Sequence, residues 1–236
     1  MIPKIIHYCW FGGKPLPSLA LKCIDSWKKY FPGYEIKQWD ESNFDINIIP
    51  YTRESYKAGK YAFVSDYARY WILYNYGGLY FDTDVEVIKP FDDILKVGPF
   101  LGVEKTRIAI TVNPGLGMGA SKGMEFYARM LEIFESWQSE TDSIKPLLIT
   151  ETSRLLKDLG WKMENKIQKC NDITIYPNDY FNPKDDYTGR IYLTVNSYSV
   201  HHYAKSWIDG YGPVRNWLSK RYHCLLETFE GLRDLG

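Results

Sequence analysis

The chain has 236 residues, and its 29 basic and 29 acidic side chains give a formal net charge of zero, which argues against bulk electrostatic binding to nucleic acid. With 45% hydrophobic and 25% charged residues it has an ordinary globular composition, so a largely disordered chain is excluded. Aromatic residues make up 17%, and their flat faces suit sugar and base rings as well as any well-packed core.

Apolar residues recur at strand or helix spacing along most of the chain, and the two types alternate in the first half. In chain order we expect a strand over 4–11, a helix over 18–30, a strand over 34–39, a helix over 61–76, a strand over 79–81, an extended segment over 84–87, helices over 124–137 and 151–159, extended segments over 173–176 and 191–203, and a terminal amphipathic helix over 222–235. This order predicts an α/β fold with a mainly parallel, Rossmann-like sheet flanked by helices.

The cysteines indicate a reducing compartment. Cys9, Cys23, Cys170 and Cys224 form no C-x-x-C pair and have no zinc-site spacing. The start of the chain lacks a basic segment followed by a long apolar run, so we expect no signal peptide. Reduced thiols in a cytoplasmic protein follow from these two observations. No apolar run approaches the roughly 18 residues of a membrane-spanning helix.

Two carboxylates, Asp82 and Asp84, stand two residues apart at the end of the apolar strand over 79–81. In an extended chain both point to one face, about 7 Å apart, and their charges repel unless a cation lies near them. Oxygen ligands favour Mg²⁺ or Mn²⁺, which share their coordination shell with substrate phosphates. The spacing therefore predicts a metal site that grips a diphosphate, and a solvated turn is the alternative.

A second charged pair precedes this strand. Asp66 and Arg69 lie one turn apart in the helix expected over 61–76, and therefore on one helix face. The alternative to a functional role is a surface ion pair that contributes little to stability. The neighbouring positions are aromatic, however, and a buried Asp and Arg need polar partners such as sugar hydroxyls. The Gly77-Gly78 turn would bring the pair near Asp82.

Together, S-D-x-x-R at 65–69 and G-G-x-Y-x-D-x-D at 77–84 resemble the sugar-binding D-x-D region of glycosyltransferase family 32. That group includes bacterial capsular polysaccharide glycosyltransferases and fungal Golgi mannosyltransferases, and the clostridial glucosylating toxins carry a similar segment. The resemblance implies a GT-A fold over 1–236, with a nucleotide-sugar and metal half over 1–100 and an acceptor-side half over 101–236. It also implies a nucleotide-sugar donor, Mn²⁺ or Mg²⁺, and retention of anomeric configuration.

The resemblance assigns catalytic roles to four residues. Asp66 and Arg69 would hold the donor sugar, Asp82 would hold the ribose, the sugar or a metal-bound water, and Asp84 would bind the metal directly. The other donor contacts that it implies are Trp10 stacked on the nucleobase, Ser65 on the nucleoside, Tyr80 packed nearby, Asn113 in a glycine-rich loop, Trp207 over the diphosphate and, as a thinner match, Asn43 on the nucleoside. For Trp10, the alternative interpretation is a position in the hydrophobic core.

Residues 201–207, H-H-Y-A-K-S-W, resemble the family's C-terminal stretch, in which a histidine completes the metal shell. Adjacent residues of a strand face opposite sides, so one histidine can be a ligand and the other cannot. His202 is the preferred third ligand beside Asp82 and Asp84, because its spacing to Trp207 fits better. His201 is the alternative, and a core histidine next to a surface histidine is the non-functional interpretation.

These features predict a metal-dependent retaining glycosyltransferase that moves galactose or glucose from a uridine-linked donor to a glycan hydroxyl in bacterial surface polysaccharide synthesis. The alternatives are a mannosyltransferase using a guanosine-linked donor and a non-catalytic sugar- or nucleotide-binding module. No covalent nucleophile is evident, so we expect front-face attack in which the leaving phosphate takes the acceptor's proton. A dehalogenase-type phosphatase is excluded, because Glu86 stands where its D-x-D-x-[TV] motif needs Thr or Val.

The acceptor side is less well marked. The predicted role places a glycan or lipid-linked oligosaccharide acceptor at the inner face of the membrane. The helix expected over 222–235 is a candidate peripheral membrane contact, and packing on the core is the alternative. Residues 148–152 depart from the T-G-P sequence usual in the family, which leaves the acceptor position open.

Overall fold

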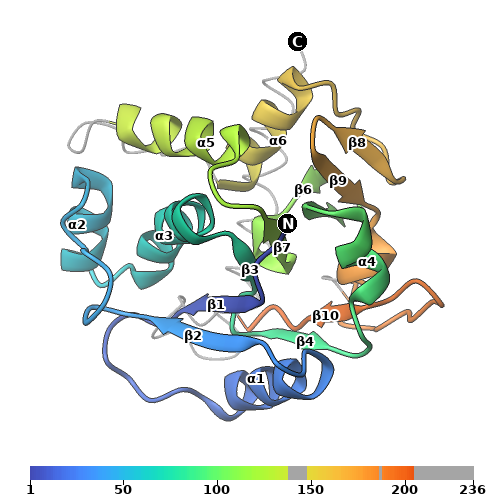
Figure 1. The fold of residues 1–236 in the computed structure, drawn as a ribbon, viewed down its shortest axis with the longest axis horizontal. Helices are drawn as coiled ribbons and strands as arrows, with labels where there is room; N and C mark the ends of the chain where they lie inside the picture. The colour runs from blue at the N-terminus through green and yellow to red at the C-terminus, as the bar shows by residue number, and fades with distance from the viewer. Residues whose placement is uncertain (138–147, 186–187, 205–236) are drawn as a thin grey trace.

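The computed structural model describes residues 1–137, 148–185 and 188–204. The helix expected over 222–235, Cys224 and Trp207 lie outside these residues. Within them, an eight-stranded sheet forms the centre of the fold (Figure 1). Its strands, in spatial order, are β2 (Glu35–Trp39), β1 (Ile5–Cys9), β3 (Gly78–Tyr80), β7 (Met118–Ala120), β5 (Phe100–Lys105), β9 (Ile173–Tyr176) and β8 (Gln168–Cys170), and β6 (Ile110–Val112) pairs with β5.

The sheet is mainly parallel, as the sequence predicts. β1 pairs in parallel with β2 and β3, and β5 pairs in parallel with β9. β7 lies between the two groups and is antiparallel to both β3 and β5, so β1, β2, β3, β5 and β9 all point the same way. A separate two-stranded sheet pairs β4 (Val85–Val87) with β10 (Ser199–His201).

Helices cover both faces of the sheet. The described helices are α1 (Ser18–Tyr30), α2 (Pro50–Lys57), α3 (Tyr61–Tyr76), α4 (Asp92–Val97), α5 (Glu125–Ser136), α6 (Leu148–Asp158) and α7 (Asn178–Phe181), with a 3₁₀ turn at Pro114–Leu116. In Figure 1, α2, α3 and α5 lie on one side of β1 and β2, and α1 lies on the other. Alternation along β1 explains the two layers, because Ile6 and Tyr8 pack with α1 and Cys9 packs with α3 and α5.

Several expected elements are confirmed. α1 and α3 have the predicted bounds, and β9, α5 and α6 lie where their apolar patterns indicate. The expectation of an extended segment over 191–203 is wrong for most of its length. Within it only β10 pairs as a strand, apart from an isolated bridge between Ile191 and Lys184, and Tyr192 and Leu193 are exposed. The sequence analysis missed α2, α4, α7, β5, β6, β7 and β8.

The junction between α3 and β3 is a tight turn that determines where the D-x-D segment begins. Gly77 and Gly78 both have positive φ, at 66° and 97°, which glycine adopts without steric cost. A Cβ atom on Gly78 would lie 2.7 Å from the carbonyl oxygen of Ile5, so the close approach of β1 to β3 needs glycine there. The helix therefore turns directly into the strand, and Arg69 comes to lie above Asp82.

His7 lies under this turn and is fully buried. Its Nδ1 accepts a hydrogen bond from Trp39 Nε1 at 3.1 Å, so its Nε2 carries the proton and donates to the Gly77 carbonyl oxygen at 3.0 Å. Burial lowers the pKa of His7 from 6.5 to about 4. The ring is therefore neutral at pH 7, and protonation of Nδ1 would break the bond from Trp39.

A neutral buried His7 should make stability fall in acid. Because its folded pKa lies below its unfolded value, the unfolded chain binds more protons between pH 6.5 and about pH 4, and this stabilisation is lost as pH falls through that window. We expect the unfolding free energy, from urea titrations at pH 7 and pH 5, to drop about 2 kcal/mol more in the wild type than in His7→Asn. The Asn amide offers a donor and an acceptor but does not titrate, so equal drops would contradict the prediction.

Two other expectations concern compartment and membrane. Cys9, Cys23 and Cys170 are buried free thiols. None of the described helices combines the length and the apolarity needed to cross a membrane.

Candidate active site

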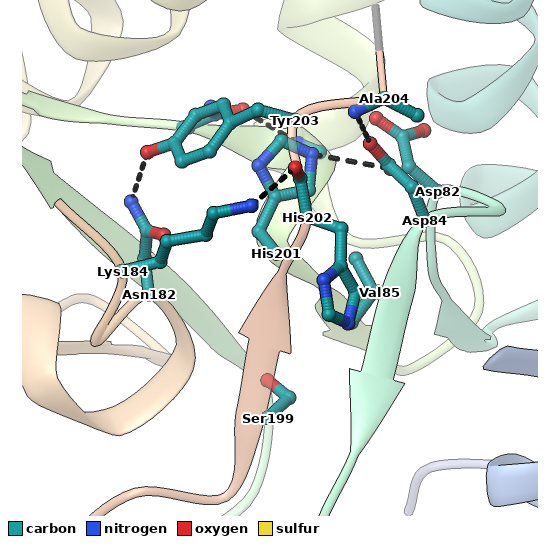
Figure 2. Close-up of polar contacts among 12 residues, drawn as sticks. Asp82, Asp84, Val85, Asn182, Lys184, Ser199, His201, His202, Tyr203 and Ala204 are labelled. Atoms are coloured by element: carbon teal, nitrogen blue, oxygen red, sulfur yellow. Dashed lines mark hydrogen bonds and ion pairs between the residues drawn. The ribbon is translucent and has the colours of Figure 1, made fainter. Parts of the chain in front are cut away.

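The two carboxylates of the D-x-D motif meet a histidine from the far end of the chain. Asp82 and Asp84 lie between β3 and β4, and β4 pairs antiparallel with β10 so that Val85 is opposite His201. His201 Nε2 lies 3.2 Å from Asp84 Oδ1. One ligand atom from each of Asp82, Asp84 and His201 lies within 4.8 Å of the others. Figure 2 shows the imidazole directed at the two carboxylates.

Backbone groups hold Asp84 in this place. The N–H of Ala204 donates to Asp84 Oδ2 at 2.7 Å, and the N–H of His202 donates to the Asp84 carbonyl oxygen at 2.9 Å. Burial raises the pKa of Asp84, but the charge and hydrogen bond of His201 and the Ala204 N–H outweigh it and hold that pKa well below its usual range. Asp84 is therefore a carboxylate at neutral pH.

His202 faces the opposite side of the strand, as alternation requires. Its Nε2 lies 2.8 Å from Glu86 Oε2, and Lys22 Nζ lies 2.8 Å from the same oxygen. Figure 2 shows its ring turned away from Asp82 and Asp84. The preference for His202 as third ligand is therefore wrong in this structure, since the pairing of β4 with β10 presents the alternative, His201.

Arg69 joins the helix pair to the motif. The guanidinium is buried, and its Nη2 lies 3.0 Å from Asp66 Oδ1 and 3.2 Å from Asp82 Oδ1. Its Nη1 donates to Asp82 Oδ2 at 3.5 Å, so the fork spans both oxygens of Asp82. The Tyr80 hydroxyl donates to Asp82 Oδ1 at 3.2 Å, and the guanidinium carbon lies 5.0 Å from the Tyr80 ring centroid. The Gly77-Gly78 turn thus brings the expected group together.

The carboxyl groups of Asp66 and Asp82 both have raised pKa values. Burial raises the pKa of Asp66 to about 6, with Arg69 lowering it and Asp82 raising it further. Burial also raises the pKa of Asp82, partly offset by Arg69 and reinforced by Asp84. Arg69 and His201 face three carboxyl groups, those of Asp66, Asp82 and Asp84, and a site with this excess of negative charge favours a further cation or the hydroxyls of a sugar.

A glycine-bearing loop closes over Asp82. Asn113 precedes the 3₁₀ turn, and its Oδ1 accepts from the Gly115 N–H at 2.8 Å, while its Nδ2 donates to Glu104 Oε2 at 2.9 Å. A Cβ atom on Gly115 would overlap Asp82 Oδ2. Asn113 therefore lies beside the motif, as the predicted donor contact would, and its side chain shapes the loop that touches Asp82.

The close approach of Gly115 predicts a local effect of substitution. Under the donor-binding role that the sequence predicts for Asp82, Gly115→Ala should push the Asp82 carboxylate out of the Arg69 fork and weaken binding of a Mn²⁺–nucleoside diphosphate about ten-fold. The unfolding free energy should change by only about 1 kcal/mol, because one methyl group is added beside a movable side chain. Calorimetric titration checks the affinity, and an unchanged affinity would mean that Asp82 has room to move without losing function.

The remaining predicted residues are peripheral in this structure. Trp10 is partly buried, donates from Nε1 to the Lys14 carbonyl oxygen at 2.6 Å and packs against the core layer next to α1. Ser65 bonds within α3 to the carbonyl oxygen of Tyr61 at 3.2 Å. Asn43 is exposed and caps the turn after β2. None of these contacts brings the three side chains to Asp82 or Asp84.

Sequence reasoning missed three polar residues of the site, Glu104, Asn182 and Tyr203. The Tyr203 hydroxyl donates to Glu104 Oε1 at 2.6 Å and also accepts from Asn182 Nδ2. Tyr203 stands inside the histidine-containing stretch that was singled out, so its position was a usable signal. Glu104 and Asn182 belong to segments without a motif.

A divalent cation fits the residues present. Two carboxylates and an imidazole within 4.8 Å form a mixed oxygen and nitrogen donor set of the kind that Mn²⁺ and Mg²⁺ sites use with substrate phosphate oxygens. The second ring nitrogen of His201, Nδ1, is buried and has no hydrogen-bond partner among the described residues. Asp82, Asp84 and His201 can therefore hold a metal ion.

Comparison with known families agrees with this geometry. Residues 17–101 match the family model described as a glycosyltransferase sugar-binding region containing the DXD motif. Over 217 residues, 88% of this chain and 84% of the relative, the chain is 28% identical to a protein of Acanthamoeba polyphaga mimivirus described as an uncharacterized glycosyltransferase. It is also 31% identical over 111 residues to inositol phosphoceramide mannosyltransferase 1 of Schizosaccharomyces pombe.

The fungal match covers 42% of this chain, and the chain spans only about a third of that relative's length, since the match covers 33% of it. Among solved structures, a glycosyltransferase involved in glycosylation of the major capsid of PBCV-1 has a TM-score of 0.53 at 12% identity. That match covers 86% of this chain and 95% of the other. At this identity the likeness shows the fold, which is the expected GT-A type.

Proposed function

Since the chain is a glycosyltransferase that carries the DXD sugar-binding region, we propose that it transfers a hexose from a nucleotide sugar to a hydroxyl group of a glycan or lipid-linked oligosaccharide, with the help of a divalent metal. The observation that carries the proposal is the continuous cluster that runs from Asp66 through Arg69 and Asp82 to Asp84 and His201. Its two ends suit the two parts of such a donor, the sugar and the diphosphate.

Each residue has a task in the proposed reaction. A bound Mn²⁺ or Mg²⁺ would supply Lewis-acid stabilisation of the departing diphosphate. Asp84 and His201 would hold that ion, with Asp82 between them and Arg69. Arg69 and Asp66 would fix the sugar hydroxyls while positive charge develops at the anomeric carbon. We further propose retention by front-face attack, with the leaving phosphate oxygen accepting the proton of the acceptor hydroxyl.

The two halves of the chain meet at this site under the proposal. Residues 1–100 supply the carboxylates and the arginine, and residues 101–236 supply Asn113 and His201 together with the acceptor side. We propose that the acceptor is an intermediate of bacterial surface polysaccharide synthesis.

Two donors have support. The resemblance to the toxin-like motif favours a uridine-linked hexose, and the similarity to a mannosyltransferase of Schizosaccharomyces pombe favours a guanosine-linked mannose. A thermal-shift panel separates them, because a ligand at a hundred times its Kd stabilises the fold by about 2.7 kcal/mol. We expect one of uridine, guanosine or thymidine diphosphate to raise the Tm by roughly 5–10 °C with Mn²⁺, and not with chelator.

The binding-module alternative needs a chemical readout. A transferase with donor and metal bound slowly transfers the sugar to water, so release of nucleoside diphosphate from the matching nucleotide sugar is expected over hours. A Mn²⁺-dependent Tm shift without any release or transfer would favour the binding module. No shift for any nucleotide would overturn the proposal of a nucleotide-sugar donor.

A further inference from the structure

A buried carboxylate outside the predicted site lies close to the metal-binding group. Glu104, on β5, is 8% exposed. Its Oε2 accepts from Asn113 Nδ2 at 2.9 Å, and its Oε1 accepts from the Tyr203 hydroxyl at 2.6 Å. Both of these hydrogen-bond donors are neutral side chains, and a carboxyl group buried in the interior depends on such bonds to offset its desolvation. Such a residue is costly, and the roles proposed above for the other side chains leave it without a task.

Its partner Tyr203 has an unusual backbone. The φ angle of Tyr203 is 53°, in the left-handed region that costs a residue with a side chain on the order of 1 kcal/mol or more. The surrounding contacts overcome this cost. The hydroxyl is bonded to both Glu104 and Asn182, and the ring packs edge-on to His201, with centroids 4.4 Å apart. Figure 2 shows Tyr203 reaching across to Asn182 above the His201 ring.

The left-handed residue stands where the chain wraps Asp84. His201 precedes it by two residues and contacts Asp84 Oδ1, and Ala204 follows it and donates its N–H to Asp84 Oδ2. The turn at Tyr203 therefore lets one short segment reach both oxygens of the same carboxylate. A relaxed backbone at 203 would displace at least one of these two contacts.

We propose that Tyr203, anchored by Glu104, is a positioning residue that holds His201 in place as the third metal ligand. The inference rests on the proposed function, because it presumes that Asp84 and His201 bind the ion. The Glu104 hydrogen bond fixes the tyrosine ring, the ring fixes both the left-handed turn and the imidazole, and the imidazole then needs no reorganisation when the ion arrives. Outer residues of this kind typically change metal affinity by 10–100-fold when they are replaced.

Direct titration of Mn²⁺ tests the proposal without any enzyme assay. The signal of free Mn²⁺ in electron paramagnetic resonance gives the Kd for the whole chain, with and without a nucleoside diphosphate. Tyr203→Phe removes only the hydroxyl and should weaken Mn²⁺ binding about ten-fold. Glu104→Gln should weaken it similarly, because a Gln side chain has a single acceptor oxygen for the two donors, Asn113 Nδ2 and the Tyr203 hydroxyl. The double variant should bind Mn²⁺ no more weakly than the weaker-binding of the two single variants. Both substitutions break the same hydrogen bond, so their effects should not add.

Controls separate this inference from the proposed metal site itself. Tyr192→Phe makes the same chemical change at an exposed tyrosine and should leave the Kd unchanged. A wild type that does not bind Mn²⁺ would overturn the metal site. A wild type that binds, with Asp84→Asn failing to bind and Tyr203→Phe binding normally, would overturn only the role of Tyr203.

A purely structural role gives a different pattern. In that case Tyr203→Phe lowers the Tm but leaves the Mn²⁺ affinity of the folded protein unchanged, which overturns the proposal. If Tyr203→Phe does not fold, Glu104→Gln decides the matter alone, and wild-type Mn²⁺ affinity in that variant overturns it. Fully additive losses in the double variant would likewise show that the two residues do not act through their shared hydrogen bond.

Discussion

Asp84→Asn should lower kcat/KM for sugar transfer about a thousand-fold, equivalent to about 4 kcal/mol of transition-state stabilisation. Asp84 contacts His201 and the Ala204 N–H, and Asn would keep its size while removing the charge that the proposed cation requires. The variant should also lose Mn²⁺ binding and the Mn²⁺-dependent rise in Tm with nucleotide. Steady-state kinetics with the donor identified by the thermal-shift panel would measure the effect.

The chain offers a matched control two residues away. Glu86 lies in β4, which begins directly after Asp84, and its Oε2 is 2.8 Å from Nε2 of a histidine, His202, on the opposite side. Glu86→Gln should therefore leave kcat/KM within about two-fold of the wild type, since its partner His202 is turned away from Asp82 and Asp84. Equal losses in the Asp84 and Glu86 variants would mean that the strand as a whole, and not the carboxylate facing His201, supports activity.

The residues close together in the chain could be placed from sequence. Asp66, Arg69 and Asp82 come together because a helix, a two-glycine turn and a short strand follow one another, and each of these has a local signal. Apolar periodicity gives the bounds of α1 and α3 for the same reason. The sequence therefore predicts correctly those features that depend on local patterns, namely the bounds of these helices and the proximity of Asp66, Arg69 and Asp82.

The parts that were missed depend on pairing between distant segments. The choice between His201 and His202 is made by the register of β10 on β4, which are more than a hundred residues apart, and no spacing within 201–207 contains it. Glu104 shows the same limit, because its segment is an ordinary apolar strand and its task comes from Tyr203. β7 is three residues long and contains Gly119, so it has neither length nor β-propensity to mark it.

Arg69→Met should cost the fold about 3–5 kcal/mol of unfolding free energy at neutral pH, because it removes a buried cation and leaves two partly buried carboxylates without it. Arg69 is 5% exposed and contacts both Asp66 and Asp82. The hydrophobic replacement keeps most of the packing of the side chain, so the loss reports the charge. Urea unfolding at pH 7 measures it, and transfer activity should vanish in the same variant because the group proposed to hold the sugar is gone.

The pH dependence identifies the cause of that loss. The pKa of Asp66 is raised to about 6 in the folded chain, mainly by burial, and it should rise further without Arg69. A raised folded pKa favours the fold below the unfolded value near 3.8, and that stabilisation is lost as pH rises through the folded pKa. The deficit of Arg69→Met relative to the wild type should therefore shrink between pH 7 and pH 5. Adding Asp66→Asn should recover part of it at pH 7, because one of the two uncompensated charges is then absent. A deficit that is the same at both pH values and unchanged by Asp66→Asn would assign the loss to packing and leave the charge balance of the site without a role in stability.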